Sequence, residues 1–401
     1  MIGVMMDRLR QDFSLSAVVA GAIAVIVSYA GPLIIVFQAA SAAHLPTEVI
    51  SSWIWAISIG SGITGLILSW HLRVPVITAW STPGAALLVG LLPGVTINEA
   101  VGAYIVSSLI IAVIGLSGAF DKLIGKLPRS IAAAMLAGIL FHFGAEMFVS
   151  IQLQPTLVMA MFVTYLLFKR LLPRYAIVAV LVIGGAVAGM SGMLNGGDIV
   201  VSVAHPVLIT PAWSWHAIIN IALPLTLVTL TGQYVPGMAV LRSSGYATPA
   251  RPIVSMTAIA SVLLAPFGSH GVNLAAITAA ICTSEEAHRE KSKRYIAGVA
   301  CGIFYIVMGI FGATLASVFT ALPKELIISL AGLALFGAIS TGLTGAMADE
   351  KQREAALITF LVTASGMNFL GMASVFWGLI FGLAAHFSLT VLSGRRPLLA
   401  R

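Results

Sequence analysis

Charged residues are the scarcest class in this chain. Only 9% of its 401 residues are Asp, Glu, Lys or Arg, whereas a soluble domain carries about 25%, and 59% are hydrophobic. Because so few charges do not suit a water-exposed surface, we expect an all-α polytopic membrane protein surrounded by the lipid bilayer. The two cysteines, Cys282 and Cys301, lie in apolar segments. They are expected to be small core residues rather than a disulfide or a metal pair.

The sequence also lacks the side-chain groupings that enzymes need. We find no metal-ligand cluster, no phosphate-binding glycine loop and no nucleophile–base spacing, so we expect no enzyme, no cofactor and no metal. The net charge of +7 could suggest nucleic acid, but the basic residues fall in short loops, where the membrane accounts for them. Residues 1–12 carry too many charges for a signal peptide.

Apolar windows of about 20 residues, long enough to cross the hydrocarbon core, occur repeatedly. We place fourteen such spans at residues 14–38, 49–70, 75–93, 97–118, 129–149, 152–171, 176–191, 215–241, 251–265, 267–286, 294–319, 325–346, 352–368 and 370–392. Several of these spans are short or interrupted, notably the third, seventh, tenth and thirteenth.

The basic residues divide unequally between the two sides of the membrane that these spans define. Of the 21 Lys and Arg residues, all but Lys324 fall at the termini or in the even-numbered loops. Because basic loops remain in the cytoplasm, we expect a multi-pass protein of the bacterial inner membrane with both termini cytoplasmic.

Interruptions recur at matching positions in the two halves of the chain. Residues 28–33 in span 1 resemble 233–238 in span 8, and 79–86 in span 3 match 265–273 in span 10. This self-similarity predicts a 7+7 inverted repeat, and paired interruptions are the sequence mark of a transporter site. The alternative is that transmembrane helices tolerate Gly and Pro in general.

The interrupted segments predict short strands and half-helices. Residues 73–80 are β-branched and bounded by proline, which favours an extended strand, and Pro and Gly interrupt 265–273. We expect the two extended segments to pair at mid-membrane. Half-helices would begin at Thr82 or Pro83 and near Gly271 to Asn273, and their free N–H groups would favour an anion.

Candidate substrate-binding residues surround this point. Gln233 is able to donate to a carboxylate without the cost of a buried charge, or to bond a neighbouring helix. Tyr29 would flank a flat ring or pack in the core. The full candidate set is Tyr29, Ser81, Thr82, Gln233, Ser269, Gly271 and Asn273.

Ionisable residues at membrane depth are few, and such residues are functional by default. His270 lies inside the interruption of span 10 and is of a type that titrates near neutral pH. It is our candidate for proton coupling, with a neutral histidine that bonds backbone carbonyls as the alternative. Glu146 is the second candidate. It lies four residues after His142 on one helix face, and structural anchoring is its alternative role.

Two segments carry a family resemblance. Residues 231–238 (TGQYVPGM) and 266–275 (PFGSHGVNLA), together with the span pattern over essentially the whole chain, resemble the bacterial benzoate:proton symporter family. The resemblance implies a fold shared with uracil/xanthine permeases and with sulfate and bicarbonate transporters. It also implies a core subdomain (14–118 and 215–319), a gate subdomain (129–191 and 325–392) and a possible homodimer.

One departure from the related nucleobase carriers bears on the substrate. Those carriers hold their ligand with carboxylates on spans 8 and 10, whereas the comparable positions here are Gln233, Gly237 and Val272 or Asn273. The absence of acidic groups favours an anion. We therefore predict a secondary active transporter for proton-coupled uptake of an aromatic carboxylate such as benzoate, in which the proton is carried by a residue or by the substrate itself.

Other functions remain open at this point. One is an uncoupled or exchanging anion carrier with the same site. Another is a transporter of a different small organic acid or of a nucleobase-like solute. A non-transporting sensor or scaffold is less favoured because every loop is short.

Overall fold

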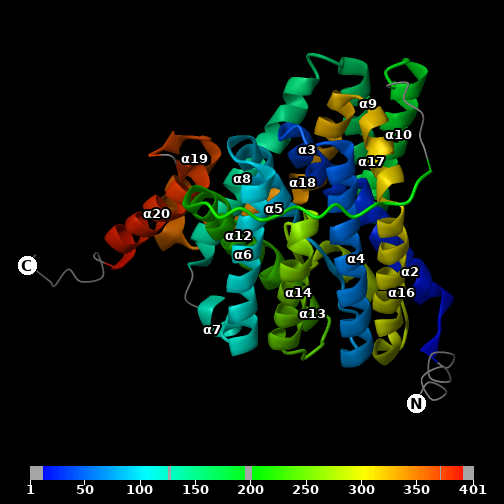
Figure 1. Cartoon of the computed structure of the whole chain (residues 1–401), viewed down its shortest axis with the longest axis horizontal. Helices are drawn as coiled ribbons and strands as arrows, with labels where there is room; N and C mark the ends of the chain where they lie inside the picture. The colour runs from blue at the N-terminus through cyan, green and yellow to red at the C-terminus, as the bar shows by residue number, and fades with distance from the viewer. Residues whose placement is uncertain (1–11, 125–127, 195–200, 371, 392–401) are drawn as a thin grey trace, which may run out of the picture.

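The computed structural model describes residues 12–124, 128–194, 201–370 and 372–391, and the chain there is mostly helical (Figure 1). The helices of the first half are α2 (Leu15–Ala30), α3 (Pro32–Ala42), α4 (Thr47–Leu72), α5 (Thr82–Leu91), α6 (Ile97–Ser117), α7 (Phe120–Ile124), α8 (Arg129–Ser150), α9 (Pro155–Leu171) and α10 (Ala176–Met190). Those of the second half are α11 (Trp215–Ala217), α12 (Leu223–Thr229), α13 (Val235–Ser243), α14 (Ala250–Leu264), α15 (Ile277–Thr283), α16 (Tyr295–Ile310), α17 (Gly312–Ala321), α18 (Lys324–Met347), α19 (Arg353–Ala364) and α20 (Ser374–His386).

The helices have the length and composition of membrane spans. Within the described residues, eight helical segments are long and apolar enough to cross a bilayer, which confirms a polytopic membrane protein. Shorter apolar helices accompany them, among them α10 and α17. The basic residues at 1–11 and 392–401, which entered the prediction of cytoplasmic termini, lie outside the described residues.

The helices pack in two main groups. In one, α4 lies along α16 and α6 along α14, with α2 against α16; in the other, α8 packs against α18 and α19, and α9 against α10 (Figure 1). Fewer contacts join the groups, and these run chiefly through α3 and α5 on one side and α8 and α18 on the other. The helices therefore contact one another less across the boundary between the groups than within either group.

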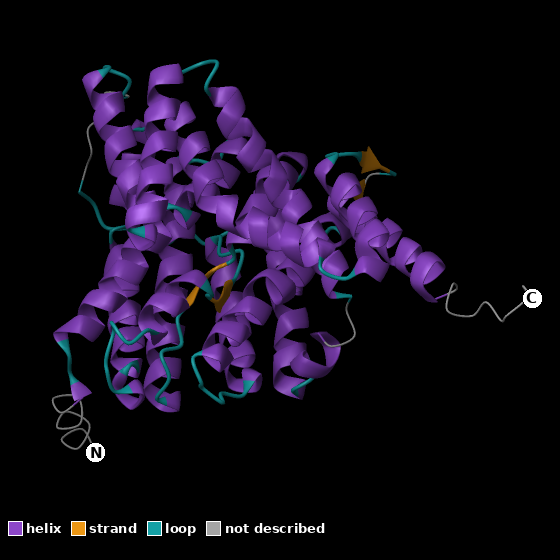
Figure 2. Ribbon diagram, turned by 180° about the vertical axis from the view of Figure 1, so that it is seen from behind, coloured by secondary structure: helices purple, strands orange, loops and turns teal. Residues whose placement is uncertain are grey.

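Two short strands lie about midway along the bundle (Figure 2). β1 (Thr78–Trp80) and β2 (Val272–Leu274) pair antiparallel, with Ala79 opposite Asn273. All six residues are buried. Pairing satisfies backbone groups that would otherwise lie unbonded in an apolar interior. A second antiparallel pair, β3 (Asn368–Phe369) with β4 (Met372–Ala373), lies between α19 and α20.

The structure corrects one expectation about span 10. The half-helix was expected to begin near Gly271 to Asn273, but those positions precede or form β2, and α15 begins at Ile277. The expectation was wrong because the backbone of Val272–Leu274 finds its partners in β1, which removes the need for helical bonding there.

An extended segment, residues 201–214, crosses the face of the helices (Figure 1); we call it the strap. Its backbone N–H groups donate to carbonyls at three places: Ala204 to Ile310, Ile209 to Pro266 and Ala212 to Asn98. Ser52 of α4 also accepts a hydrogen bond from the Val207 N–H and donates one to the Phe267 carbonyl. The strap is thereby fixed to the group of helices that contains the two central strands.

Candidate functional site

A serine of the preceding long helix holds the chain two residues before β1 and at the first residue of β2. Ser69 of α4 accepts a hydrogen bond from the Val76 N–H (3.1 Å) and donates one to the Val76 carbonyl (3.0 Å). Ser261 of α14 makes the same two bonds with Val272, at 2.8 and 3.2 Å. A buried strand of three residues cannot satisfy all its backbone groups by pairing alone, and these serines complete the bonding.

His270 joins three elements just before β2. Its Nδ1 lies 3.0 Å from Trp53 Nε1 of α4, and its Nε2 lies 3.0 Å from the Ser81 carbonyl at the start of α5. Because the indole N–H only donates and the carbonyl only accepts, His270 must be the neutral tautomer with its proton on Nε2. Both ring nitrogens are therefore engaged, and the side chain is 2% exposed.

The backbone at the start of α5 is hydrogen-bonded, as it is in the two central strands. Ser81 Oγ accepts from the Gly84 N–H (3.0 Å) as an N-cap, and Pro83 occupies the first turn, where a missing N–H does no harm. With the Asn273 amide oriented to satisfy its neighbours, Oδ1 accepts from the Ser81 N–H (3.3 Å) and Nδ2 donates to the Val272 carbonyl. In this conformation the N–H, the carbonyl and the Oγ of Ser81 each have a protein partner.

Three of the predicted site residues have an unusual environment or backbone conformation. Ser269 is 0% exposed, and its hydroxyl has no partner among the described residues. Gln233 is buried in a π-helical turn (Leu230–Tyr234), a feature common at functional sites. Gly271 has φ +138, which side-chain-bearing residues rarely adopt.

The structure places Tyr29 in the core beside the strands. Its hydroxyl donates to Ser58 Oγ, and its ring lies 5.5 Å from Trp80 and 6.0 Å from Tyr305 between centroids. Tyr29 is 6% exposed. This aromatic cluster is packed behind β1, so contact between Tyr29 and a ligand would need the cluster to open.

Glu146 lies apart from this group, at a cavity of about 900 Å³ between α3, α5, α8 and α18. The cavity is lined by Ala86 and Leu87 of α5 but not by Ser81 or Thr82, so it ends along α5 before the strands. His142, on the same helix as Glu146, donates from Nε2 to the Ala364 carbonyl (2.6 Å). The structure thus brings together Ser81, Thr82 and residues 269–273, and places Glu146 apart from them at the cavity.

Sequence reasoning missed several partners that hold the site. Trp53, Ser69 and Ser261 fix His270 and the two strands. A tryptophan near the start of span 2 was a usable signal, because a buried indole N–H usually finds a partner. Nothing in the sequence identified which partner that would be.

Replacing His270 with alanine should lower the thermal stability markedly. The change leaves the Trp53 N–H buried without a partner, at about 1–3 kcal/mol, and removes one of the two hydrogen bonds to the Ser81 carbonyl, which keeps the bond from the Ala85 N–H. Thermal unfolding of the purified protein in detergent measures the effect, and His205→Ala, at an exposed strap position, is the matched control. Equal melting temperatures for the two variants would show that these bonds contribute little.

Comparison with known proteins relates this geometry to a family. Residues 11–388 match the family model described as benzoate membrane transport protein. The chain belongs to that family. It is 50% identical over 385 residues to a benzoate membrane transport protein of Acinetobacter baylyi, covering 96% of this chain and 98% of that one. It is also 43% identical to the inner membrane protein YdcO of Escherichia coli, covering 94% and 96%.

Membership of this family makes the chain a membrane transporter and not an enzyme. Solved structures with the same fold include SLC26A9, with a TM-score of 0.65 at 15% identity, covering 96% of this transporter and 66% of that chain. The transmembrane domain of the cyanobacterial bicarbonate transporter BicA has a TM-score of 0.56 at 12% identity, covering 92% and 97%. At such identities the likeness concerns the fold alone.

Proposed function

We propose that this transporter takes up an aromatic carboxylate, benzoate first among them, together with a proton across the bacterial inner membrane. The observation that carries the proposal is the 50% identity, over almost the whole of both chains, to a benzoate membrane transport protein. The lack of acidic side chains around the central strands supports an anionic rather than a nucleobase-like substrate.

We propose fourteen spans arranged as a 7+7 inverted repeat, with both termini cytoplasmic. The packing supports this arrangement, because a shift of seven spans exchanges the pair α4 and α16 with the pair α14 and α6. The same shift relates the serine anchors at Ser69 and Ser261. Antiparallel pairing of β1 with β2 also suits two halves of opposite orientation.

The two groups of helices would be the core subdomain (14–118 and 215–319) and the gate subdomain (129–191 and 325–392). The smaller contact between the groups supports relative motion there. The strap, which bonds to the core group, would move with it. A homodimer is part of the same proposal.

The substrate carboxylate would bind where α5 begins opposite the interruption of span 10. Ser81, Thr82, Ser269, Gly271 and Asn273 are the proposed ligands. The unpartnered Ser269 hydroxyl supports this placement, because a buried hydroxyl normally has a partner. Gln233 would donate its amide from the side, and Tyr29 would flank the aromatic ring once its cluster opens.

His270 and Glu146 are the proposed proton-coupling groups, and they differ in access. Protonation of His270 at Nδ1 requires its bond from Trp53 to break, so proton uptake there would be tied to a rearrangement of α4. Glu146 is exposed to the cavity and would exchange protons freely. A third route is a proton carried on the substrate as the neutral acid.

Proteoliposomes containing the full chain should accumulate labelled benzoate when the pH outside is lower than inside. Accumulation should stop when a protonophore collapses the gradient, because the coupled proton supplies the driving force. Protein-free liposomes are the control, since benzoic acid crosses lipid unaided. If uptake does not depend on the pH gradient but is faster into liposomes preloaded with benzoate, the protein is an exchanger. If the pH gradient drives uptake of another solute but not of benzoate, the proposed substrate is wrong.

A further inference from the structure

The cavity of about 900 Å³ between α3, α5, α8 and α18, which we call the vestibule, has the dimensions of a ligand site in its own right. Small-molecule sites occupy roughly 300–1,000 Å³ and are mostly apolar with a few polar groups. Its walls include Phe37 of α3, Leu87 of α5, Phe143 of α8 and Ile327 of α18. Such walls suit an aromatic ring.

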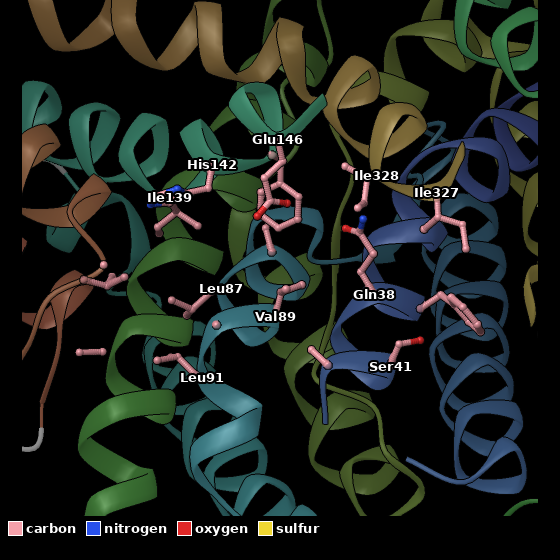
Figure 3. Close-up of a pocket in the computed structure, with 18 of the residues that line it drawn as sticks. Gln38, Ser41, Leu87, Val89, Leu91, Ile139, His142, Glu146, Ile327 and Ile328 are labelled. Atoms are coloured by element: carbon pink, nitrogen blue, oxygen red, sulfur yellow. The ribbon is translucent and has the colours of Figure 1, made fainter. Parts of the chain in front are cut away.

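Two buried polar atoms of residues that line the vestibule, Gln38 Oε1 and Thr363 Oγ1, have no partner among the described residues. The Gln38 side-chain oxygen is buried and bonds to nothing that the structure describes. Figure 3 shows the side chains of Gln38 from α3 and Glu146 from α8 directed into the same space. The oxygen only accepts, but the NH2 group of the same amide can donate to a carboxylate that enters this space.

The vestibule is lined by one positively charged and one negatively charged residue. Among its described lining residues, Lys324 carries the positive charge and Glu146 the negative charge, with His44 and His142 as the other titratable groups. Lys324 is also the single basic residue that the charge pattern places on this side of the membrane, out of 21. An isolated ammonium at a cavity of low polarity attracts anions effectively.

We propose that the vestibule is a binding station that selects aromatic monocarboxylates before they reach the central strands. Lys324 pairs with the carboxylate, the Gln38 NH2 group donates a hydrogen bond to it, and the ring lies on the apolar walls. Glu146, which also lines the vestibule, repels the second negative charge of a dicarboxylate. This proposal rests on the proposed transport of aromatic acids, and it assigns the discrimination between mono- and dianions to a site separate from Gln233 and Asn273.

Equilibrium binding of labelled benzoate and labelled terephthalate to the full-length protein in nanodiscs tests the station, because binding does not require proton coupling. Glu146→Gln should improve the affinity for terephthalate relative to benzoate by about tenfold, since it removes one like-charge repulsion. Glu146→Asp should retain the discrimination of the native protein. Glu325→Gln, an equal change of charge on α18 at a residue that does not line the cavity, is the matched control.

Lys324 provides an independent arm of the experiment. Lys324→Gln should weaken benzoate binding severalfold at low salt and less at high salt, whereas Lys324→Arg should retain it. The station is refuted if native protein binds benzoate but Glu146→Gln leaves the terephthalate-to-benzoate ratio unchanged, or if Glu325→Gln alters it equally. Failure of native protein to bind benzoate at all would instead refute the proposed function, and the station with it.

Discussion

Glutamate in place of Gln233 should abolish benzoate binding and uptake. The two side chains have nearly the same shape, and the position is 8% exposed in the π-helical turn of span 8. The substitution therefore places a negative charge beside the proposed carboxylate site. Two carboxylates about 5 Å apart at an effective dielectric near 20 repel by about 3 kcal/mol, which is a loss of more than 100-fold in affinity. Equilibrium binding of labelled benzoate measures the loss.

Gln152→Glu is the matched control for this prediction, because Gln152 is exposed beyond the end of α8. It should bind benzoate as the native protein does. A Gln233→Glu variant that still binds benzoate would place the carboxylate elsewhere. If the variant loses benzoate but gains a ligand rich in N–H donors, the new carboxylate has recreated the acceptor that nucleobase carriers use.

Valine at Gly302 should prevent the protein from folding. A Cβ at this position of α16 would lie 2.7 Å from the Gly62 carbonyl oxygen and 2.8 Å from Leu66 Cβ, both on α4. The helices approach so closely because small residues line their contact, and a rigid backbone atom cannot yield. We expect a loss of about 3 kcal/mol or more, seen as failure to recover monodisperse protein by fluorescence-detected size exclusion.

The same substitution on α18 distinguishes the effect of steric crowding from the effect of valine's low helix propensity. Gly337→Val adds an identical side chain at an exposed position with no atom within 4 Å of the new Cβ. It should yield folded protein in near-native amount. If both variants are lost equally, the intrinsic cost of valine in a helix is responsible, and the close contact of α4 with α16 is not.

The long helices could be predicted from hydropathy alone, because a helix that crosses lipid must be apolar over its whole length. The span expected at 49–70 is α4 (Thr47–Leu72), and that at 325–346 is α18 (Lys324–Met347). The interrupted spans were harder to delimit. β2 depends on pairing with β1, almost 200 residues earlier, and no local pattern specifies such a partner.

The site could be located from sequence more readily than it could be described. Gly and Pro identified where the chain stops being helical, and the absence of carboxylates suggested an anion. The sequence did not show that His270 is bonded on both sides or that the Ser81 N–H pairs with Asn273. It also did not reveal Gln38, whose unpartnered oxygen appears only when α3 is packed against the vestibule. These facts depend on tertiary contacts between distant segments.

The pairing of β1 with β2 also limits which mutations the two strands can accept. Ala79 lies opposite Asn273, and each three-residue strand has the other as its pairing partner. An insertion in either strand would shift the register and turn buried side chains to the wrong face. Substitutions in one strand must therefore be matched in the other, so the two segments cannot diverge independently. The most constrained pairs of positions should be those about 195 residues apart.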